Sequence, residues 1–393
     1  MTTLTPHPVR PAPDGAAPLA GRWSGHVPAA RVGRADPLGL DPLMARLPGL
    51  NRDGDVRAIM GGLTAVVPAL EALPGMRTWE VLAAVRDLGM LVASLVRHGL
   101  TTADVPPEVE TALASSVART GMVPRETILH YGVWNPADAG RRRTFTGDPS
   151  EYALIDCSAA ATGPLETAAR GLSALVEHGV EPGEQRFETT CLTAARELEH
   201  AAAYVRMEHT GLDPVFFTRH LRPYFDPFTV HGVSYHAPAA AHLPLYAVDQ
   251  AVWAADDTRH PELAELRTDL AAYGLPAWTA CHEGLRGEDS LLTRTVRALG
   301  SSHVPVTTMV GARALLTTLK AMVAFRGRHR RLVRAAYTDE QRQSQIGSGG
   351  VGQDVIDELL SVTRDCAALA GEAIRSAPRP AAAARDHAER RPA

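Results

Sequence analysis

The chain has 393 residues, of which 45% are hydrophobic, and this is enough apolar material for one large or two ordinary globular domains. Its 40 Lys and Arg residues against 44 Asp and Glu residues give a net charge of −4. The chain therefore lacks the excess of positive charge that is typical of nucleic-acid-binding proteins, and it contains no block of acidic residues that would form a solvated tail. These bounds favour a small molecule as the partner.

The cellular compartment follows from the N-terminus and the cysteines. The N-terminus lacks the apolar segment of a signal peptide, and no window approaches 18 uncharged apolar residues, so neither secretion nor membrane insertion is expected. The four cysteines lie far apart without a CxxC pair, which argues against the usual zinc and disulfide frameworks and fits a reducing compartment. We therefore expect a cytoplasmic protein.

Both ends of the chain lack the patterns of folded elements. Residues 1–35 and 377–393 are rich in Pro, Ala and Arg without periodicity, which predicts a disordered leader and a disordered tail. Residues 36–376 are predicted to form the folded domain. We divide it into a smaller N-terminal helical part, about 36–150, and a larger part, about 151–376.

In the N-terminal part, residues 55–73 have a helical pattern with a kink at Pro68, and residues 79–98 are apolar at nearly every turn, which predicts a buried helix. Gly89, Ala93 and Ser94 make part of one face of the second helix small. Such a face serves either close helix packing or the wall of a cavity over a flat ligand.

A turn at 101–104 precedes a helix over 108–120, and 124–130 begins a further short helix. Residues 131–147 contain Asn-Pro and read as an extended, loop-like connection between the two parts.

The larger part is helical in pattern and the fold class is therefore predicted to be all-α. Strand signal is confined to 228–230 and 233–235, which resemble a hairpin. The predicted helical segments are 163–178, 185–209, 239–255, 261–299, 315–337 and 354–374.

His329 lies on the apolar stripe of the helix predicted over 315–337. Leu315, Leu319 and Met322 recur at helical spacing, and His329 follows Met322 by seven residues on the same face, so it is expected to point inward. An inward histidine is either a satisfied core residue or a metal ligand.

The residues next to His329 in sequence bear on whether it is a core residue or a metal ligand. Five arginines, at positions 326, 328, 330, 331 and 334, surround it in sequence, and they form either a solvated basic face or partners for buried anions such as the propionates of a porphyrin. A glycine-rich run follows at 346–350. It is either a plain linker between two helices or a loop that lets the backbone approach a ligand closely.

Several separate segments together resemble the heme-dependent family of monodechloroaminopyrrolnitrin synthase, which is related to indoleamine and tryptophan 2,3-dioxygenases. The likeness runs from about Asp41 to Leu369. The segments are Leu47-Pro-Gly-Leu-Asn-Arg52, Arg86-Asp-Leu-Gly89 with Ser94-Leu95, Pro124-Arg-Glu-Thr127 with Val133-Trp-Asn-Pro136, Leu221-Arg-Pro223, Phe325-Arg326 with His329, and Ile346-Gly-Ser-Gly-Gly350.

The resemblance implies heme b (iron protoporphyrin IX) as the cofactor and His329 as the proximal iron ligand. Gly347, Gly349 and Gly350 would approach the cofactor. Tyr337 and Ser348 match positions that face the substrate, and both are expected to take part in catalysis.

Further residues match the dioxygenase substrate pocket. Arg222 matches an arginine that grips the substrate carboxylate, and a guanidinium suits that task because it offers two parallel donors. Phe217 matches an aromatic residue that packs on the indole, and Ser94 matches a serine of the distal pocket; Ser94 and Arg222 are also expected to take part in catalysis. From the residues alone, Arg222 also reads as a surface arginine at a helix end.

The sequence departs from those relatives in two places. Met90 and Leu91 stand where the dioxygenases carry a Phe-Phe pair, which implies a wider or reshaped substrate pocket. His236 and His242 replace smaller or acidic residues, and each is either a proton donor in the pocket or an ordinary surface or core residue.

The resulting hypothesis is an oxidoreductase that uses heme with dioxygen or peroxide to oxidise or rearrange the indole of tryptophan or a substituted tryptophan in bacterial biosynthesis. The alternatives are a heme-dependent hydroxylase of tyrosine, a non-catalytic heme carrier or sensor, and a helical interaction protein without a cofactor. A carrier would need His329 but not Arg222, Tyr337 or Ser348.

Overall fold

The computed structural model describes residues 29–237, 244–337 and 352–378. Within these ranges the chain is almost entirely helical, and the only sheet is the predicted hairpin of β1 (Phe228–Val230) and β2 (Val233–Tyr235), so the all-α prediction is confirmed.

The α-helices are α1 (Ala29–Arg34), α2 (Asp41–Asp53), α3 (Val56–Leu70), α4 (Thr78–Arg97), α5 (Pro107–Thr120), α6 (Pro149–Glu177), α7 (Gln185–Gly211), α8 (Pro214–Phe216), α9 (Leu245–Asp249), α10 (Pro261–Ala271), α11 (Pro276–Gly284), α12 (Leu291–Leu299), α13 (Val306–Ala336) and α14 (Gln353–Ser376). Short 3-10 or π-helical turns are η2 (Leu73–Gly75), η3 (Thr102–Asp104), η4 (Leu129–Val133), η5 (Ala139–Arg141), η6 (Phe217–Leu221), η7 (Arg222–Phe225) and η9 (Gln250–Ala254).

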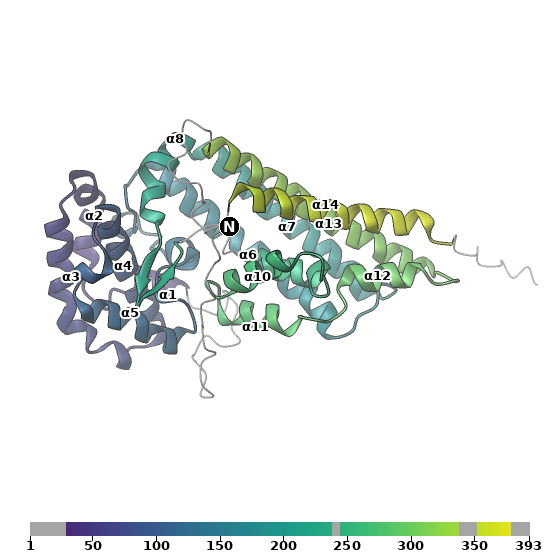
Figure 1. Ribbon diagram of the computed structural model, residues 1–393, viewed down its shortest axis with the longest axis horizontal. Helices are drawn as coiled ribbons and strands as arrows, with labels where there is room; N and C mark the ends of the chain where they lie inside the picture. Colours follow the sequence, from purple (N-terminus) through teal and green to yellow (C-terminus); the bar gives the residue numbers. More distant parts are fainter. Residues whose placement is uncertain (1–28, 238–243, 338–351, 379–393) are drawn as a thin grey trace, which may run out of the picture.

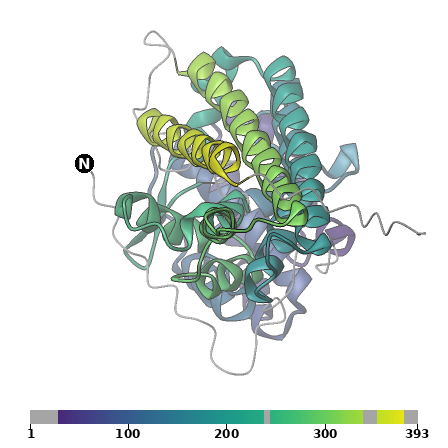
Figure 2. The same ribbon diagram turned by 90° about the vertical axis from the view of Figure 1, so that its right-hand side faces the viewer.

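The helices form two packed groups, which Figure 1 shows at opposite ends of an elongated molecule. Helices α2 to α5 make the first group around a core that contains Leu63 and Leu88. The second group is built on the long helices α6, α7, α13 and α14, with a core that contains Leu198 and Leu319. Figure 2 shows α7, α13 and α14 side by side when the molecule is turned by 90°.

Capping side chains fix where several helices begin. Asp55 accepts a hydrogen bond from the Ala58 backbone nitrogen at 3.0 Å at the start of α3, and Asp148 accepts one from the Ser150 nitrogen at 2.8 Å at the start of α6. At the other end of α5, Gly121 adopts a left-handed conformation with φ of 67°, which an L side chain rarely takes. These local signals divide the chain into the helices that then pack.

A buried ionic network ties α4 to the segment before α6. Arg86 and Arg143 are both fully buried, and both donate to the Asp87 carboxylate, from Arg86 Nε at 2.7 Å and from Arg143 Nη2 at 3.0 Å. Arg143 also pairs with Asp41 of α2, while Arg86 donates to the Val32 carbonyl at 3.1 Å. The Arg86-Asp87 motif therefore joins α1, α2 and α4 to the connection between the two groups.

Gly89 makes room for a second motif. A Cβ at this position would lie 2.8 Å from the Glu126 backbone nitrogen and 2.3 Å from its Oε2, so α4 approaches the segment at 124–127 this closely only with glycine. Glu126 is fully buried and accepts a hydrogen bond from Arg125 Nη2 at 2.6 Å. At Gly89, the small face of α4 serves close packing.

Helix α13 is long and apolar enough to cross a membrane by length and composition, but 56% of its most apolar window is buried inside the protein. It packs against α7 and α14. Such burial is typical of the central helix of a globular core.

Two predicted boundaries were wrong. The leader was expected to reach residue 35, whereas α1 is helical over Ala29–Arg34 and its Val32 is fully buried under α4, because Arg86 binds the carbonyls of this segment. Helix α6 begins at Pro149, well before the expected 163, and continues through Pro164. Residues 1–28 and 379–393 of the predicted leader and tail lie outside the described residues.

The short helix predicted over 124–130 was also wrong in its first half. Residues 124–127 are not helical, and a π-helical turn, η4, begins only at Leu129. The reason is that Arg125 and Glu126 pair with each other in the core, and Arg125 Nη1 reaches the Tyr235 carbonyl at 2.8 Å. This tertiary contact overrides the local helical pattern.

Candidate functional site

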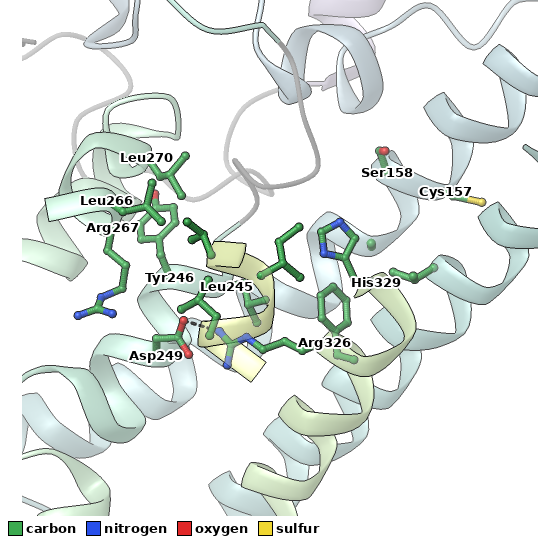
Figure 3. Close-up of a pocket in the computed structure, with 16 residues that line it drawn as sticks. Cys157, Ser158, Leu245, Tyr246, Asp249, Leu266, Arg267, Leu270, Arg326 and His329 are labelled. Carbon is green, nitrogen blue, oxygen red and sulfur yellow. Dashed lines mark hydrogen bonds and ion pairs between the residues drawn. The ribbon is translucent and has the colours of Figure 1, made fainter. Parts of the chain in front are cut away.

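A cavity of about 1010 Å³, measured out to its mouth, opens between α6, α9, α10, α13 and α14 (Figure 3). Most of the wall is apolar, and it includes Ala161, Val205, Leu245, Leu270, Val355 and Leu359. The cavity therefore suits a largely hydrophobic ligand.

His329 reaches this cavity from α13, on the stripe that the sequence predicts (Figure 3). Leu319 and Met322 of the stripe are fully buried, and His329 is half-buried at the cavity wall. No described residue forms a hydrogen bond or ion pair with its imidazole. Burial, assisted by the charge of Arg326, lowers the pKa of His329 to about 4, so the ring is neutral at pH 7 and keeps a lone pair for a metal.

Charged groups lie together at another part of the cavity wall (Figure 3). Arg326 is buried and donates to Asp249 Oδ2 at 2.5 Å and to Thr363 Oγ1 at 2.5 Å. Arg267 of α10 lines the same region. The cavity thus has an apolar body with an imidazole and a separate charged region.

The arginines around His329 divide between the two roles that the sequence left open. Arg326 faces the cavity, while Arg330 and Arg334 pair with Asp357 on α14, and Arg331 is exposed. Most of the basic run is therefore a solvated helix face, and one guanidinium reaches the ligand cavity.

A second group of predicted residues meets at the C-terminal end of α13. Arg222 is only 6% exposed, so it is not a surface arginine, and its Nη1 donates to Asp226 Oδ1 at 2.7 Å. The Phe217 ring meets the Tyr337 ring edge to face, with centroids 6.3 Å apart. Burial raises the pKa of Tyr337, while the adjacent Arg222 works in the opposite direction. The structure thus brings Phe217, Arg222 and Tyr337 together.

The residues matched to the distal pocket lie elsewhere. Ser94, Met90 and Leu91 are fully buried in the core of the first helix group and do not line the cavity of His329. The Ser94 hydroxyl donates to the Met90 carbonyl at 2.9 Å and accepts from Asn51 Nδ2 at 3.2 Å. Here Ser94 holds α4 to α2.

The remaining predicted residues are placed as follows. The His236 backbone nitrogen donates to the Tyr273 hydroxyl at 2.8 Å, and the two rings lie 6.2 Å apart, outside the lining of the cavity. Gly347, Ser348, Gly349, Gly350 and His242 lie outside the described residues.

Sequence reasoning missed the partners of the cavity's charged region. Asp249 and Arg267 come from α9 and α10, in segments without a motif, and neither spacing nor residue type distinguishes them from solvated charges. Only their burial, at 2% and 3% exposure, reveals them.

A buried histidine behind the cavity makes its surroundings sensitive to acid. His282 packs edge-on against Tyr246 of the cavity wall, with ring centroids 5.7 Å apart, and neither ring nitrogen has a hydrogen-bond partner among the described residues. Burial lowers the pKa of His282 to about 4.

Acidification from pH 7 to pH 5 should therefore destabilise the fold through His282. Because its folded pKa lies below its unfolded value of about 6.5, the unfolded chain takes up the proton first, and stability is lost as the pH falls through this window. The contribution of His282 is at most about 2 kcal/mol. Urea unfolding at both pH values should show a smaller loss for His282→Phe than for the wild type. The exposed His200→Phe should behave like the wild type, and an equal loss in all three would contradict the prediction.

The helical fold and an apolar cavity, lined by a neutral imidazole without a partner among the described residues, are typical of a protein that acts on a small molecule. Over residues 74–387 the chain matches the family described as monodechloroaminopyrrolnitrin synthase PrnB. The protein belongs to this family, and the resemblance predicted from its motifs is confirmed. The family is one of biosynthetic enzymes that act on tryptophan derivatives, and the matched range contains both the cavity of His329 and the Arg222 group.

Proposed function

We propose that this protein is a heme-dependent oxidoreductase that oxidises or rearranges the indole ring of tryptophan or a substituted tryptophan in a bacterial biosynthetic pathway. The observation that carries the proposal is His329, a neutral imidazole without a partner among the described residues, facing an apolar cavity in a chain of this family.

The residues present fit heme b. The imidazole of His329 would ligate the heme iron, and the aliphatic wall suits the faces of a porphyrin. The charged region at Arg326 and Arg267 suits anionic groups on such a ligand. Elsewhere in the described residues, no three His, Cys, Asp or Glu side chains gather as a metal site.

A bound heme would supply activation of dioxygen or peroxide, and the chain would supply orientation. Arg222 would hold the carboxylate of the amino acid, with Tyr337 and Ser348 at the same end, and Phe217 would pack on the ring. Ser94, Met90 and Leu91 would shape the pocket only through the packing of α4, because their side chains are enclosed in its core.

The proposal is tested by reconstituting the purified protein with hemin, recording the absorption spectrum, and analysing products with tryptophan and substituted tryptophans under air. A Soret band and an oxidised or rearranged indole are expected. Absence of a Soret band would contradict every heme-dependent function, and turnover of tyrosine alone would favour the hydroxylase.

Arg222 should make binding depend on the substrate carboxylate. Spectral titration of the heme-loaded protein should show tryptophan binding about 30-fold or more tightly than tryptamine, because losing a charged, buried hydrogen bond costs about 2–5 kcal/mol. In Arg222→Met the two ligands should bind alike. The exposed neighbour Arg219→Met is the matched control and should keep the wild-type preference. Equal binding of both ligands to the wild type would remove Arg222 from this role.

A further inference from the structure

Arg267 is a buried cation whose hydrogen-bonding capacity the described residues leave partly unused. Its side chain comes from α10, lines the cavity and is 3% exposed. The Nε and Nη1 atoms are buried without a hydrogen-bond partner among the described residues. Burial lowers the pKa of Arg267, which means that its surroundings disfavour the charge. A guanidinium in this state is expected to meet an acceptor that the described residues do not provide.

The nearest carboxylates are already engaged. Asp249 accepts from Arg326 Nη2 at 2.5 Å and from Trp253 Nε1 at 2.9 Å. Asp257 accepts from Arg259 Nε at 3.2 Å and contacts His260 Nδ1 at 2.7 Å. Their charges favour the guanidinium of Arg267 from a distance, yet neither carboxylate accepts a hydrogen bond from it.

The described side chains of the charged region carry one excess positive charge, because Arg267 and Arg326 bring two positive charges and Asp249 brings one negative charge. The other contact of Arg267 is the face of Trp253, with the guanidinium carbon 4.9 Å from the ring centroid. The face of an aromatic ring attracts a cation, but it does not replace the hydrogen bonds that the guanidinium N–H groups make in water. The contact with Trp253 therefore offsets only part of the free-energy cost of burying the charge of Arg267.

We propose that Arg267 is the anion-binding residue of the His329 cavity and that it takes a carboxylate of the ligand bound there. The inference rests on the proposed function for the identity of that ligand. The carboxylate comes either from a propionate of the cofactor or from an amino-acid substrate. Both present the planar pair of oxygens that the paired N–H donors of Arg267 match.

The first arm of the test uses the protein without ligand, and it does not depend on heme. In Arg267→Met the buried, uncompensated charge is gone while much of the side-chain volume stays, so the melting temperature should rise by about 1–3 °C. The exposed Arg286→Met removes a positive charge nearby, outside the cavity lining, and should leave the melting temperature unchanged. A lower melting temperature in Arg267→Met would overturn the inference, because Arg267 would then be a structural residue.

The second arm identifies the source of the carboxylate. Hemin and hemin dimethyl ester are titrated into wild type, Arg267→Met and Arg286→Met, followed by spectral titration with tryptophan and tryptamine. If a propionate is the ligand, the dissociation constant of hemin should rise at least about 10-fold in Arg267→Met alone, while the ester should bind all three proteins equally. If the substrate carboxylate is the ligand, hemin should bind equally and only tryptophan binding should weaken, and Arg267 would then replace Arg222 as the residue that binds the substrate carboxylate.

The outcomes keep the two proposals apart. A wild type without a Soret band would contradict the proposed heme function, and the melting temperatures would still decide the role of Arg267. A wild type that binds hemin, together with an Arg267→Met variant that matches it for all four ligands, would overturn the inference and leave the heme proposal intact.

Discussion

Replacing His329 with alanine should abolish stable heme binding. Even the outer partners of metal ligands typically contribute 10–100-fold to affinity, so loss of the ligand itself should weaken heme binding by more than about 100-fold. The helix should persist, since His329 forms no hydrogen bond with the described residues and alanine is the better helix former. Absorption and electron-resonance spectra after hemin titration measure the effect.

The control for His329→Ala is the exposed His200→Ala on α7, which should bind hemin like the wild type. Free imidazole should restore part of the five-coordinate spectrum of His329→Ala, because it fits the space that the side chain leaves. An unchanged spectrum in His329→Ala would show that another side chain ligates the iron.

The largest effect on stability is expected at Asp87. Asp87→Ala leaves Arg86 and Arg143 buried with one positive charge uncompensated, and breaking such a network costs about 3–5 kcal/mol. Urea unfolding should show this loss, whereas Asp156→Ala, which breaks the solvent-exposed pair with Arg142, should cost less than about 1 kcal/mol. Equal losses in the two variants would mean that the network does not hold the first helix group.

Lowering the pH should reproduce part of the stability loss expected for Asp87→Ala, because it protonates the Asp87 carboxylate. Burial alone would raise the pKa of Asp87, but Arg86 and Arg143 more than offset it, so its pKa lies below the usual range. The pKa of Asp87 is lower in the folded protein than in the unfolded chain, where it is about 3.9. Its contribution to stability is therefore complete above the unfolded-state pKa and is lost as the pH falls through the folded-state pKa. The contribution of Asp87 should therefore remain intact at pH 5, in contrast to that of His282.

The sequence predicted those parts of the structure that local pattern controls. The apolar stripe placed His329 on the inner face of α13, and α4, α5, α7 and the hairpin were predicted within a few residues. The predictions failed where tertiary contacts override local signals. Gly163-Pro164 reads as a helix start, yet α6 runs straight through it because the helix is already fixed on both sides by core packing.

The candidate site divides in the same way. His329 could be predicted from periodicity, because one face of one helix determines its direction. The meeting of Arg222 with Tyr337 followed only from the resemblance to a family, since the two residues come from segments more than 100 positions apart. Asp249 and Arg267 could not be predicted at all, because only burial distinguishes them from solvated charges, and burial arises from the packing of α9, α10 and α13.

The contact between Gly89 and Glu126 restricts how this protein can be redesigned. The closest obstacle apart from a side-chain oxygen is the Glu126 backbone nitrogen, at 2.8 Å from a Cβ on residue 89. Shortening the side chain at 126 therefore does not admit a larger residue at 89. Any chain that keeps this crossing of α4 must keep glycine there, and the α4 register cannot slip by a residue without bringing a bulkier neighbour, Leu88 or Met90, onto the same backbone atom.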